Sequence, residues 1–218
     1  MSLQSLRIRN FKAVVDSKTV KLRPLTAFIG NNGAGKSSLI EALETYQAIV
    51  RDGLDVAMQR WLGIEHVRHK AQEAKERMGQ LVNPISFELA LGESPRKVRR
   101  LAMTVNNDPA ANRMLIASER MTRLDGTWTE RDPGGALQSY GPGRSMLPYA
   151  LDEDLVRAAD EVLAWQFLTL SPERMGLPVP QQRTKGAVRL ANDGSNVADF
   201  LLDLRRQDAN AFNGIVET

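Results

Sequence analysis

Apolar and polar residues alternate over the first 23 positions of the chain. Leu6 and Ile8 alternate with arginines, and Val20 and Leu22 alternate with basic residues in the same way. A period of two is typical of strands with one buried face, so two half-buried strands are predicted here. The apolar run at residues 25–29 has no such alternation, which predicts a strand covered on both faces in a parallel sheet.

After a glycine-rich turn, the apolar residues from Leu39 to Val50 recur at helical spacing. This spacing predicts a helix that begins near Lys36 and ends at about Asp52 or Gly53. Residues 54–80 are helical in composition, and their KAQEAKER stretch is interpreted as a solvated helix face.

From Ile85 the period of the pattern changes from helical to two. Alternating runs near residues 85–91, 101–105 and 115–124 predict strands, and the Asp-Gly pair at 125–126 predicts a hairpin turn into TWTE. Residues 81–131 are therefore predicted to form an antiparallel lobe of three or four strands. The following residues, 132–148, are rich in glycine and proline and predict an exposed loop.

The remaining residues, 149–218, are predicted to be mainly helical. Acidic residues at 152–154 favour a helix start, because they complement the helix dipole, and apolar residues at helical spacing follow them. Residues 167–170 read FLTL and predict a short buried strand, whereas 176–188 predict a loop. A last clear helix is predicted from Val197 to Leu204, and helical spacing continues in AFNGIVET.

Composition limits the class of protein. The 218 residues are 42% hydrophobic, and 29 basic against 26 acidic residues give a net charge of +3. This near balance is weak evidence for nucleic-acid binding. The absence of cysteine excludes disulfides and thiolate sites and suits a reducing cytoplasm. No apolar run approaches the ~20 residues that cross a bilayer, so a cytoplasmic protein without a membrane partner is expected.

The glycine-rich turn carries the most specific chemical signal. Gly30, Gly35, Lys36 and Ser37 satisfy the Walker A pattern G-x-x-x-x-G-K-[ST], between an apolar run and an amphipathic helix. Glycines let successive N–H groups point at phosphate oxygens, and the helix dipole favours negative charge there. The predicted site for ATP and Mg²⁺ comprises Gly30, Asn31, Asn32, Gly33, Ala34, Gly35, Lys36, Ser37 and Ser38.

Each polar group of this loop has an expected role. Lys36 is the catalytic candidate and is expected to contact the β- and γ-phosphates, while the hydroxyl of Ser37 is the candidate Mg²⁺ ligand. Gly35 is expected to contact the nucleotide through its backbone, and Ser38 is expected to make a further contact with it at the helix N-terminus. Asn32 and Gly33 are expected to set the geometry of the loop.

The first 50 residues resemble the N-terminus of ABC-type ATPases of the RecF, SMC and OLD-like group, which include predicted AAA-family ATPases. The matching positions are Ile8, Asn10, Phe11, Lys12, Gly30, Asn32, Gly33, Ala34, Gly35, Lys36 and Ser37. The resemblance implies an α/β P-loop NTPase fold of ABC/SMC type, with a mixed sheet and an antiparallel β lobe. It also implies that Lys12 lies near the phosphates, and that residues 190–204 are similar to a segment preceding the signature motif.

Hydrolysis in the resembled family needs further motifs. A Walker B aspartate and glutamate hold the metal and orient water, and a partner subunit adds a signature motif. Asp152 and Glu153 are interpreted as a helix N-terminus rather than Walker B, because Pro148 breaks the short apolar run before them. LSPERMG at 170–176 is rejected as a signature motif, because Pro172 stands where glycine is required. The SPERM segment also lacks the glutamine expected of a Q-loop.

Two basic clusters remain open to more than one interpretation. His66 and His69 lie among basic residues, where a solvated or phosphate-facing patch is favoured over a metal site. The RKVRR run at 96–100 is typical of a solvated strand face and is also a candidate contact for a DNA backbone.

The leading interpretation is one incomplete ATPase domain over residues 1–218, the N-terminal part of a longer protein. In this interpretation, residues 1–53 form the strand pair, the Walker A loop and the first helix, and residues 54–80 form a helical segment. Residues 81–131 are expected to form the antiparallel β lobe, and residues 149–218 the helical part. The full-length protein is expected to hydrolyse ATP as a homodimer formed through ATP, with DNA and a downstream effector as candidate partners. The alternative is a nucleotide-gated interaction module without enzymatic turnover. A GTPase or kinase of another P-loop class is disfavoured, because no Asn-Lys-x-Asp guanine motif is found.

Overall fold

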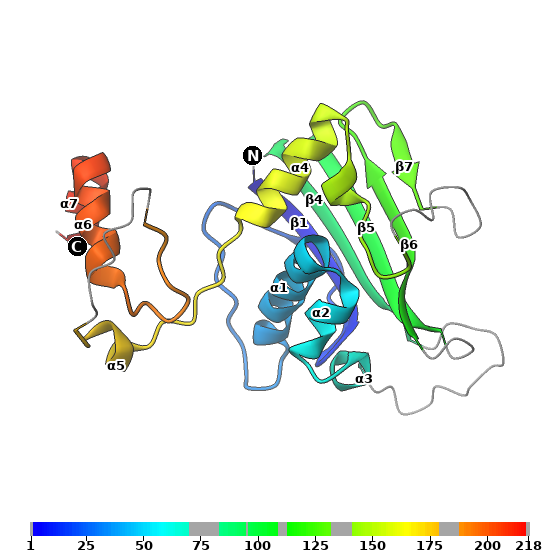
Figure 1. The fold of residues 1–218 in the computed structure, drawn as a ribbon, viewed down its shortest axis with the longest axis horizontal. Coiled ribbons are helices and arrows are strands. Elements are labelled where there is room, and N and C mark those ends of the chain that lie inside the picture. Colours follow the sequence, from blue (N-terminus) through cyan, green and yellow to red (C-terminus); the bar gives the residue numbers. More distant parts are fainter. Residues whose placement is uncertain are drawn as a thin grey trace. The chain divides into compact units, whose positions relative to one another are not determined.

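The computed structural model describes residues 2–69, 83–94, 96–108, 113–131, 141–178 and 188–216. The chain divides into two compact units, Met1–Trp165 and Gln166–Thr218 (Figure 1). None of the helices within the described residues is long and apolar enough to cross a membrane. The helix predicted in the KAQEAKER stretch falls outside the described residues.

Unit 1 is built on one antiparallel sheet. Within the described residues it has seven strands in the order β2-β1-β4-β5-β6-β7, and β3 also pairs with β1. The alternating pattern after Ile85 predicted three or four strands, and the structure has four, with the Asp-Gly turn between the last two and Gly126 at φ +88°. The strands are β1 (Ser2–Phe11), β2 (Val14–Asp16), β3 (Val20–Lys21), β4 (Ile85–Ser94), β5 (Lys97–Asp108), β6 (Arg113–Thr122) and β7 (Trp128–Glu130).

Helices α1, α2 and α4 lie on one face of this sheet (Figure 1). Phe87 of β4 packs against Phe11 of β1 and Tyr46 of α1, with ring centroids 6.4 and 5.6 Å away, and all three side chains are fully buried. The core of unit 1 therefore lies between the sheet and α1. The helical elements are α1 (Lys36–Asp52), α2 (Leu54–Gln59), α3 (Ile64–Val67), a 3-10 turn (Leu147–Tyr149) and α4 (Glu153–Ala164).

A buried glutamine joins α1 to the end of α4. The Nε2 group of Gln47 donates to the carbonyl oxygens of Val162, Leu163 and Trp165, at 2.8, 3.3 and 2.9 Å. The last carbonyls of a helix lack their usual N–H partners within the helix, so this side chain supplies donors to them, in addition to the bond from Trp165 N–H to Val162 O. Gln47 thus fixes the C-terminal end of α4 against the helix that follows the glycine-rich loop.

The other end of α4 is held to the sheet by an ion pair whose contribution depends on pH. Arg99 Nη2 lies 2.6 Å from Asp154 Oδ1, and the N–H of Leu124 donates to Asp154 Oδ2. The hydrogen bond from Arg99, followed by that from Leu124, lowers the pKa of the Asp154 carboxyl. A lowered folded-state pKa stabilises the fold above the unfolded-state pKa of about 3.9, and this stabilisation is lost as pH falls through the folded value.

We therefore expect Asp154→Asn to be destabilising near neutral pH and less destabilising at about pH 3, below the ordinary aspartate pKa, where part of the stabilisation is already lost. Urea unfolding of the wild type and the variant at both pH values measures this difference. Asp160→Asn, at an exposed position of the same helix, is the control and should show no such pH-dependent gap. An equal gap between wild type and Asp154→Asn at both pH values would contradict the assignment.

The prediction of a strand at residues 25–29 is wrong. These residues have no regular secondary structure, and Leu25 and Ile29 are 90% and 93% exposed. All strand pairings within the described residues are antiparallel, so the parallel part of the predicted mixed sheet is not formed by them. An apolar run becomes a strand only where neighbouring strands pair with its backbone, and the described sheet offers this run no such neighbour.

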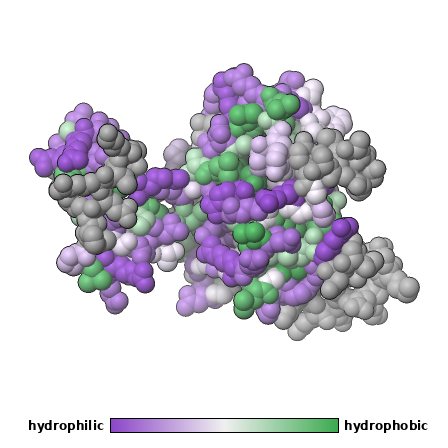
Figure 2. All heavy atoms as spheres, in the orientation of Figure 1, coloured by the Kyte–Doolittle hydropathy of each residue, from purple (hydrophilic) through white to green (hydrophobic). Residues whose placement is uncertain are grey.

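The prediction of a buried strand at residues 167–170 is also wrong. Leu168 and Leu170 are exposed, and the segment is irregular, although the N–H of Thr169 donates to Asn192 O at 2.7 Å. A short apolar sequence alone does not bury itself, because burial requires a facing layer of side chains. Figure 2 shows that hydrophobic residues also remain visible at separate places on the helix-bearing face of unit 1.

The loop predicted to be exposed at 132–148 is buried over residues 145–147. The reason is Glu119, a 2% exposed residue of β6, whose carboxylate accepts hydrogen bonds from Ser145 Oγ and the N–H of Met146. Burial raises the pKa of Glu119 above its ordinary value, although these hydrogen bonds oppose the shift. The carboxylate therefore holds this loop segment inside unit 1, which composition could not indicate.

Unit 2 contains three helices within the described residues. The predicted helix beginning at Val197 is confirmed, and the turn before it is closed by Asn196, whose Oδ1 accepts from the N–H of Ala191 at 2.7 Å. None of the described apolar side chains of unit 2 is fully buried. The helices are α5 (Pro172–Met175), α6 (Val197–Gln207) and α7 (Ala209–Val216).

Candidate functional site: the glycine-rich loop at the start of helix α1

Helix α1 begins at Lys36, as the spacing predicted, and the glycine-rich loop leads directly into it. Gly33 and Gly35 have φ angles of +82° and +85°, in a region that other residues rarely adopt. A Cβ atom on Gly35 would also lie 3.2 Å from Val14 Cγ2 of β2. Glycine at 35 is thus needed for backbone conformation and for close packing of the loop against β2.

The start of α1 presents a group of backbone donors. Within the described residues, no acceptor pairs with the N–H groups of Gly35, Lys36, Ser37 and Ser38, and no side chain caps the helix. The first turn contains no acidic residue. Free N–H groups and the positive end of the helix dipole together make a 17-residue helix start of this kind suitable for binding an anion such as phosphate.

The Lys36 side chain folds back across the loop. Its Nζ donates to the carbonyl oxygens of Gly30 and Asn31, both at 2.7 Å. The ammonium group therefore lies beside the loop backbone, on a half-buried side chain, at the same end of α1 as the free N–H groups. Its positive charge adds to theirs and favours a polyanionic ligand over a neutral one.

The remaining loop residues differ in accessibility. Residues 31–34 and Ser37 are exposed, whereas Ser38 is 8% exposed. The hydroxyl of Ser37 is thus accessible to a metal ion, and a serine hydroxyl is an oxygen ligand of the type that Mg²⁺ prefers. Ser38 has little accessible surface, so any contact it makes with a ligand would have to come from its backbone N–H.

Lys12 lies in the turn between β1 and β2, and α1 holds its side chain. Its Nζ is 2.8 Å from Glu41 Oε2 and 3.6 Å from the centroid of the Trp61 ring. Neither partner was predicted from the sequence, because Glu41 and Trp61 are distant along the chain and no local pattern links them to Lys12. The expected position of Lys12 beside the phosphates stays a prediction.

The acidic pair considered as a Walker B motif forms a helix start, as predicted. Asp152 is the N-cap of α4, and its side chain accepts from the N–H groups of Asp154 and Leu155 at 3.0 and 3.2 Å. In the rejected signature candidate, Pro172 begins the four-residue helix α5. Both segments have structural roles that their sequences explain.

The structure places the residues of the two basic clusters in different surroundings. His69 Nδ1 lies 2.8 Å from Lys12 O, and no group of three or more metal-binding side chains occurs among the described residues. In the RKVRR run, Arg99 is buried on the helix side of the sheet and pairs with the half-buried Asp154, whereas Arg100 is exposed on the other side. The run is therefore not one continuous basic surface.

The strand pair, the free N–H groups and the lysine together form a loop and helix start that suit a phosphate-bearing ligand. Residues 1–52 match the family model of the AAA ATPase domain, a segment that runs from β1 to the last residue of α1. A comparison with curated protein sequences found no match to this chain. The match supports an ATP-binding function for the segment that holds the loop.

Proposed function

We propose that this chain binds ATP together with Mg²⁺ at the loop and helix start formed by residues 30–38. The observation that carries the proposal is the set of free N–H groups at Gly35 to Ser38 beside the Lys36 ammonium, within the segment that matches the AAA ATPase domain. In this proposal Lys36 contacts the β- and γ-phosphates and the Ser37 hydroxyl coordinates Mg²⁺. The metal, when bound, neutralises charge on the phosphates.

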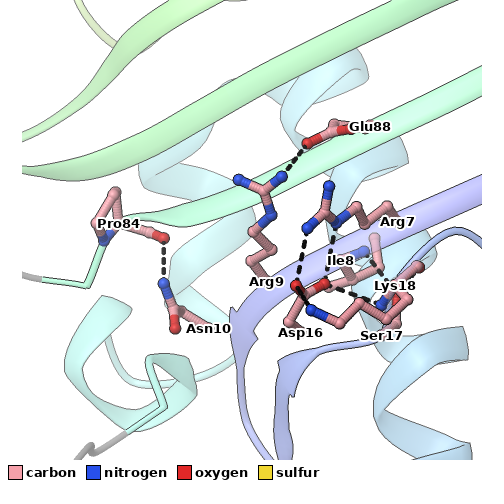
Figure 3. A network of polar contacts seen from close by, with 9 residues as sticks. All are labelled: Arg7, Ile8, Arg9, Asn10, Asp16, Ser17, Lys18, Pro84 and Glu88. Atoms are coloured by element: carbon pink, nitrogen blue, oxygen red, sulfur yellow. Dashed lines mark hydrogen bonds and ion pairs between the residues drawn. The ribbon is translucent and has the colours of Figure 1, made fainter.

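The finer proposal is an ATPase of ABC/RecF/SMC type, acting as an ATP-linked homodimer in DNA transactions or defence. It is supported by Asn10 and Phe11, the residues of the resemblance that precede the loop. Asn10 has φ +56° and its Nδ2 donates to Pro84 O at 2.9 Å, which ties the end of β1 to the start of β4 (Figure 3). Phe11 is fully buried against Trp61 and Phe87, so these residues set the position of β1 beside the loop.

We expect the 218-residue chain to bind ATP without sustained hydrolysis. Phosphoryl transfer needs a group that orients the attacking water, and the acidic pair at 152–153 is engaged at the start of α4. Isothermal titration with Mg-ATP measures binding, and a phosphate-release assay on the same preparation measures turnover. Sustained phosphate release that is lost on Lys36→Ala would contradict this expectation, and absence of ATP binding would contradict the proposed site.

The second candidate function is a nucleotide-gated interaction module in which turnover has no role. It is favoured by the same engagement of Asp152 as a helix cap. The two functions differ in the lifetime of the ATP-bound state. The comparison is made on the full-length protein, where the ATPase proposal places hydrolysis. If ATP and a non-hydrolysable analogue hold the same oligomeric state with equal persistence there, the module is favoured. If only the analogue holds that state, hydrolysis releases it and the ATPase is favoured.

A further inference from the structure

The face of the sheet opposite the helices, here called the outer face, has its own pattern of side chains. Successive residues of a strand point to opposite faces, so Leu6 and Ile8 enter the core while Arg7 and Arg9 point away from it. Figure 3 shows Arg9 reaching Glu88 of β4, and Arg7 meeting Asp16 of β2. One row across this face joins Ser5, Ala90, Arg100, Thr122 and Trp128 by direct cross-strand pairing.

This outer face contains a hollow of about 280 Å³. Its floor includes Ala90 and Ala102, whose short side chains leave space between the longer ones around them. Arg7, Arg100 and Arg120 line the same hollow, each from a different strand. Glu88 also lines the hollow but is paired with Arg9, and Arg7 is paired with Asp16. The positive charge offered to a ligand therefore comes from Arg100 and Arg120, and the planar donors of arginine match phosphate oxygens.

Arg100 and Arg120 are the two arginines of this hollow that can contact a ligand, and Arg100 is the more available of the two. Its side chain is exposed, and within the described part of the chain it has no carboxylate partner. Arg120 pairs with Glu130 at 2.6 Å, but the two side chains are 52% and 43% exposed. Exposed ion pairs contribute only about 0–1 kcal/mol, so a phosphate can replace Glu130 as the partner of Arg120 at small cost.

An exposed aromatic ring lies next to the hollow. Trp128 of β7 pairs with Thr122, which lines the hollow, and the Trp128 side chain is 61% exposed. The guanidinium carbon of Arg120 lies 5.7 Å from the centroid of its ring. An indole face beside arginines and hydroxyls is the combination that stacks a base while the adjacent phosphates are neutralised.

We propose that the outer face binds single-stranded nucleic acid, with backbone phosphates at Arg100 and Arg120 and a base stacked on Trp128. A single strand fits better than a duplex, because only bases that are not already stacked between neighbours can lie on an aromatic side chain. Ser5, Thr19 and Thr122 supply hydroxyl groups in the same hollow for sugar and phosphate oxygens. This site lies on the sheet and does not depend on ATP binding at Lys36.

Fluorescence anisotropy with a labelled oligothymidine of about 12 nucleotides tests the proposal, since single-stranded sites span ~4–16 nucleotides. Trp128→Ala is expected to weaken binding about fivefold or more, because stacking of one base contributes ~1–3 kcal/mol. Arg100→Ala is expected to weaken binding and to reduce the dependence of log affinity on log salt by about 0.7. Arg157→Ala, which removes a 62% exposed arginine of α4, is the matched control and should leave the affinity unchanged.

Several outcomes would overturn the proposal. Among them are no binding at low salt, equal binding by wild type and the Arg100→Ala and Trp128→Ala variants, and equal affinity for a duplex of the same length. Circular dichroism of each variant confirms that the fold is retained. Lys36→Ala separates this site from the nucleotide loop: oligothymidine binding that survives this substitution supports the outer face, whereas its loss, or displacement of the oligonucleotide by Mg-ATP, places the contact at the loop.

Discussion

Lys36→Ala is expected to weaken ATP binding by about 10- to 100-fold. Hydrogen bonds to charged groups contribute ~1.5–3 kcal/mol, and each 1.4 kcal/mol corresponds to a tenfold change in affinity. The lysine ammonium already lies at the loop, beside the carbonyl oxygens of Gly30 and Asn31, so little rearrangement is needed to face a phosphate. Titration of the wild type and the variant with Mg-ATP measures the difference.

Arg51→Ala is the matched control, because Arg51 is an exposed cation at the other end of the same helix, paired with Asp52. It should leave ATP affinity unchanged. The thermal unfolding temperature of Lys36→Ala should match that of the wild type, because the two hydrogen bonds that the lysine makes are exposed. Undiminished ATP affinity in the lysine variant would exclude this loop as the phosphate site.

Phe87→Ala is expected to lower the free energy of unfolding of unit 1 by about 3–5 kcal/mol, the usual cost of removing a buried phenyl group. The Phe87 side chain is fully buried between Phe11 and Tyr46, so its removal leaves a cavity where β1, β4 and α1 meet. Urea unfolding followed by circular dichroism measures the loss.

The neighbouring residue provides the control for this substitution. Ser86 points to the outer face of the same strand, so Ser86→Ala should change the free energy of unfolding by less than about 1 kcal/mol. Equal effects of the two substitutions would mean that the core is not centred on Phe87.

Patterns within a short stretch of sequence predicted the elements that are stabilised locally. The spacing of apolar residues and the flanking glycine residues predicted α1 from Lys36 to Asp52, and two-residue alternation predicted β4, β5 and β6. The acidic residues at 152–154 predicted a helix start, and Asp152 does cap α4. Each of these signals depends on residues that contact one another within a few positions.

Interactions between distant residues could not be predicted in this way. The apolar run at 25–29 predicts a strand only if other strands pair with it, and its sequence carries no information on whether they do. The same limit applies to Lys12 with Glu41 and Trp61, and to Gln47 at the end of α4. These contacts depend on how the loop, helix and sheet come together, so they became visible only in the structure.

The exposed run at residues 25–29 has a consequence for how this chain behaves at high concentration. Leu25 and Ile29 are exposed, and within the described part of the chain no backbone hydrogen bond is made by residues 25–29. Such a stretch is a template for β-sheet association between molecules. Arg23 and Pro24 precede it and Gly30 follows it, and charged, proline and glycine residues at the ends of such a stretch act as gatekeepers against aggregation. The segment before the glycine-rich loop is therefore apolar, but the residues on both sides of it oppose the formation of intermolecular strands.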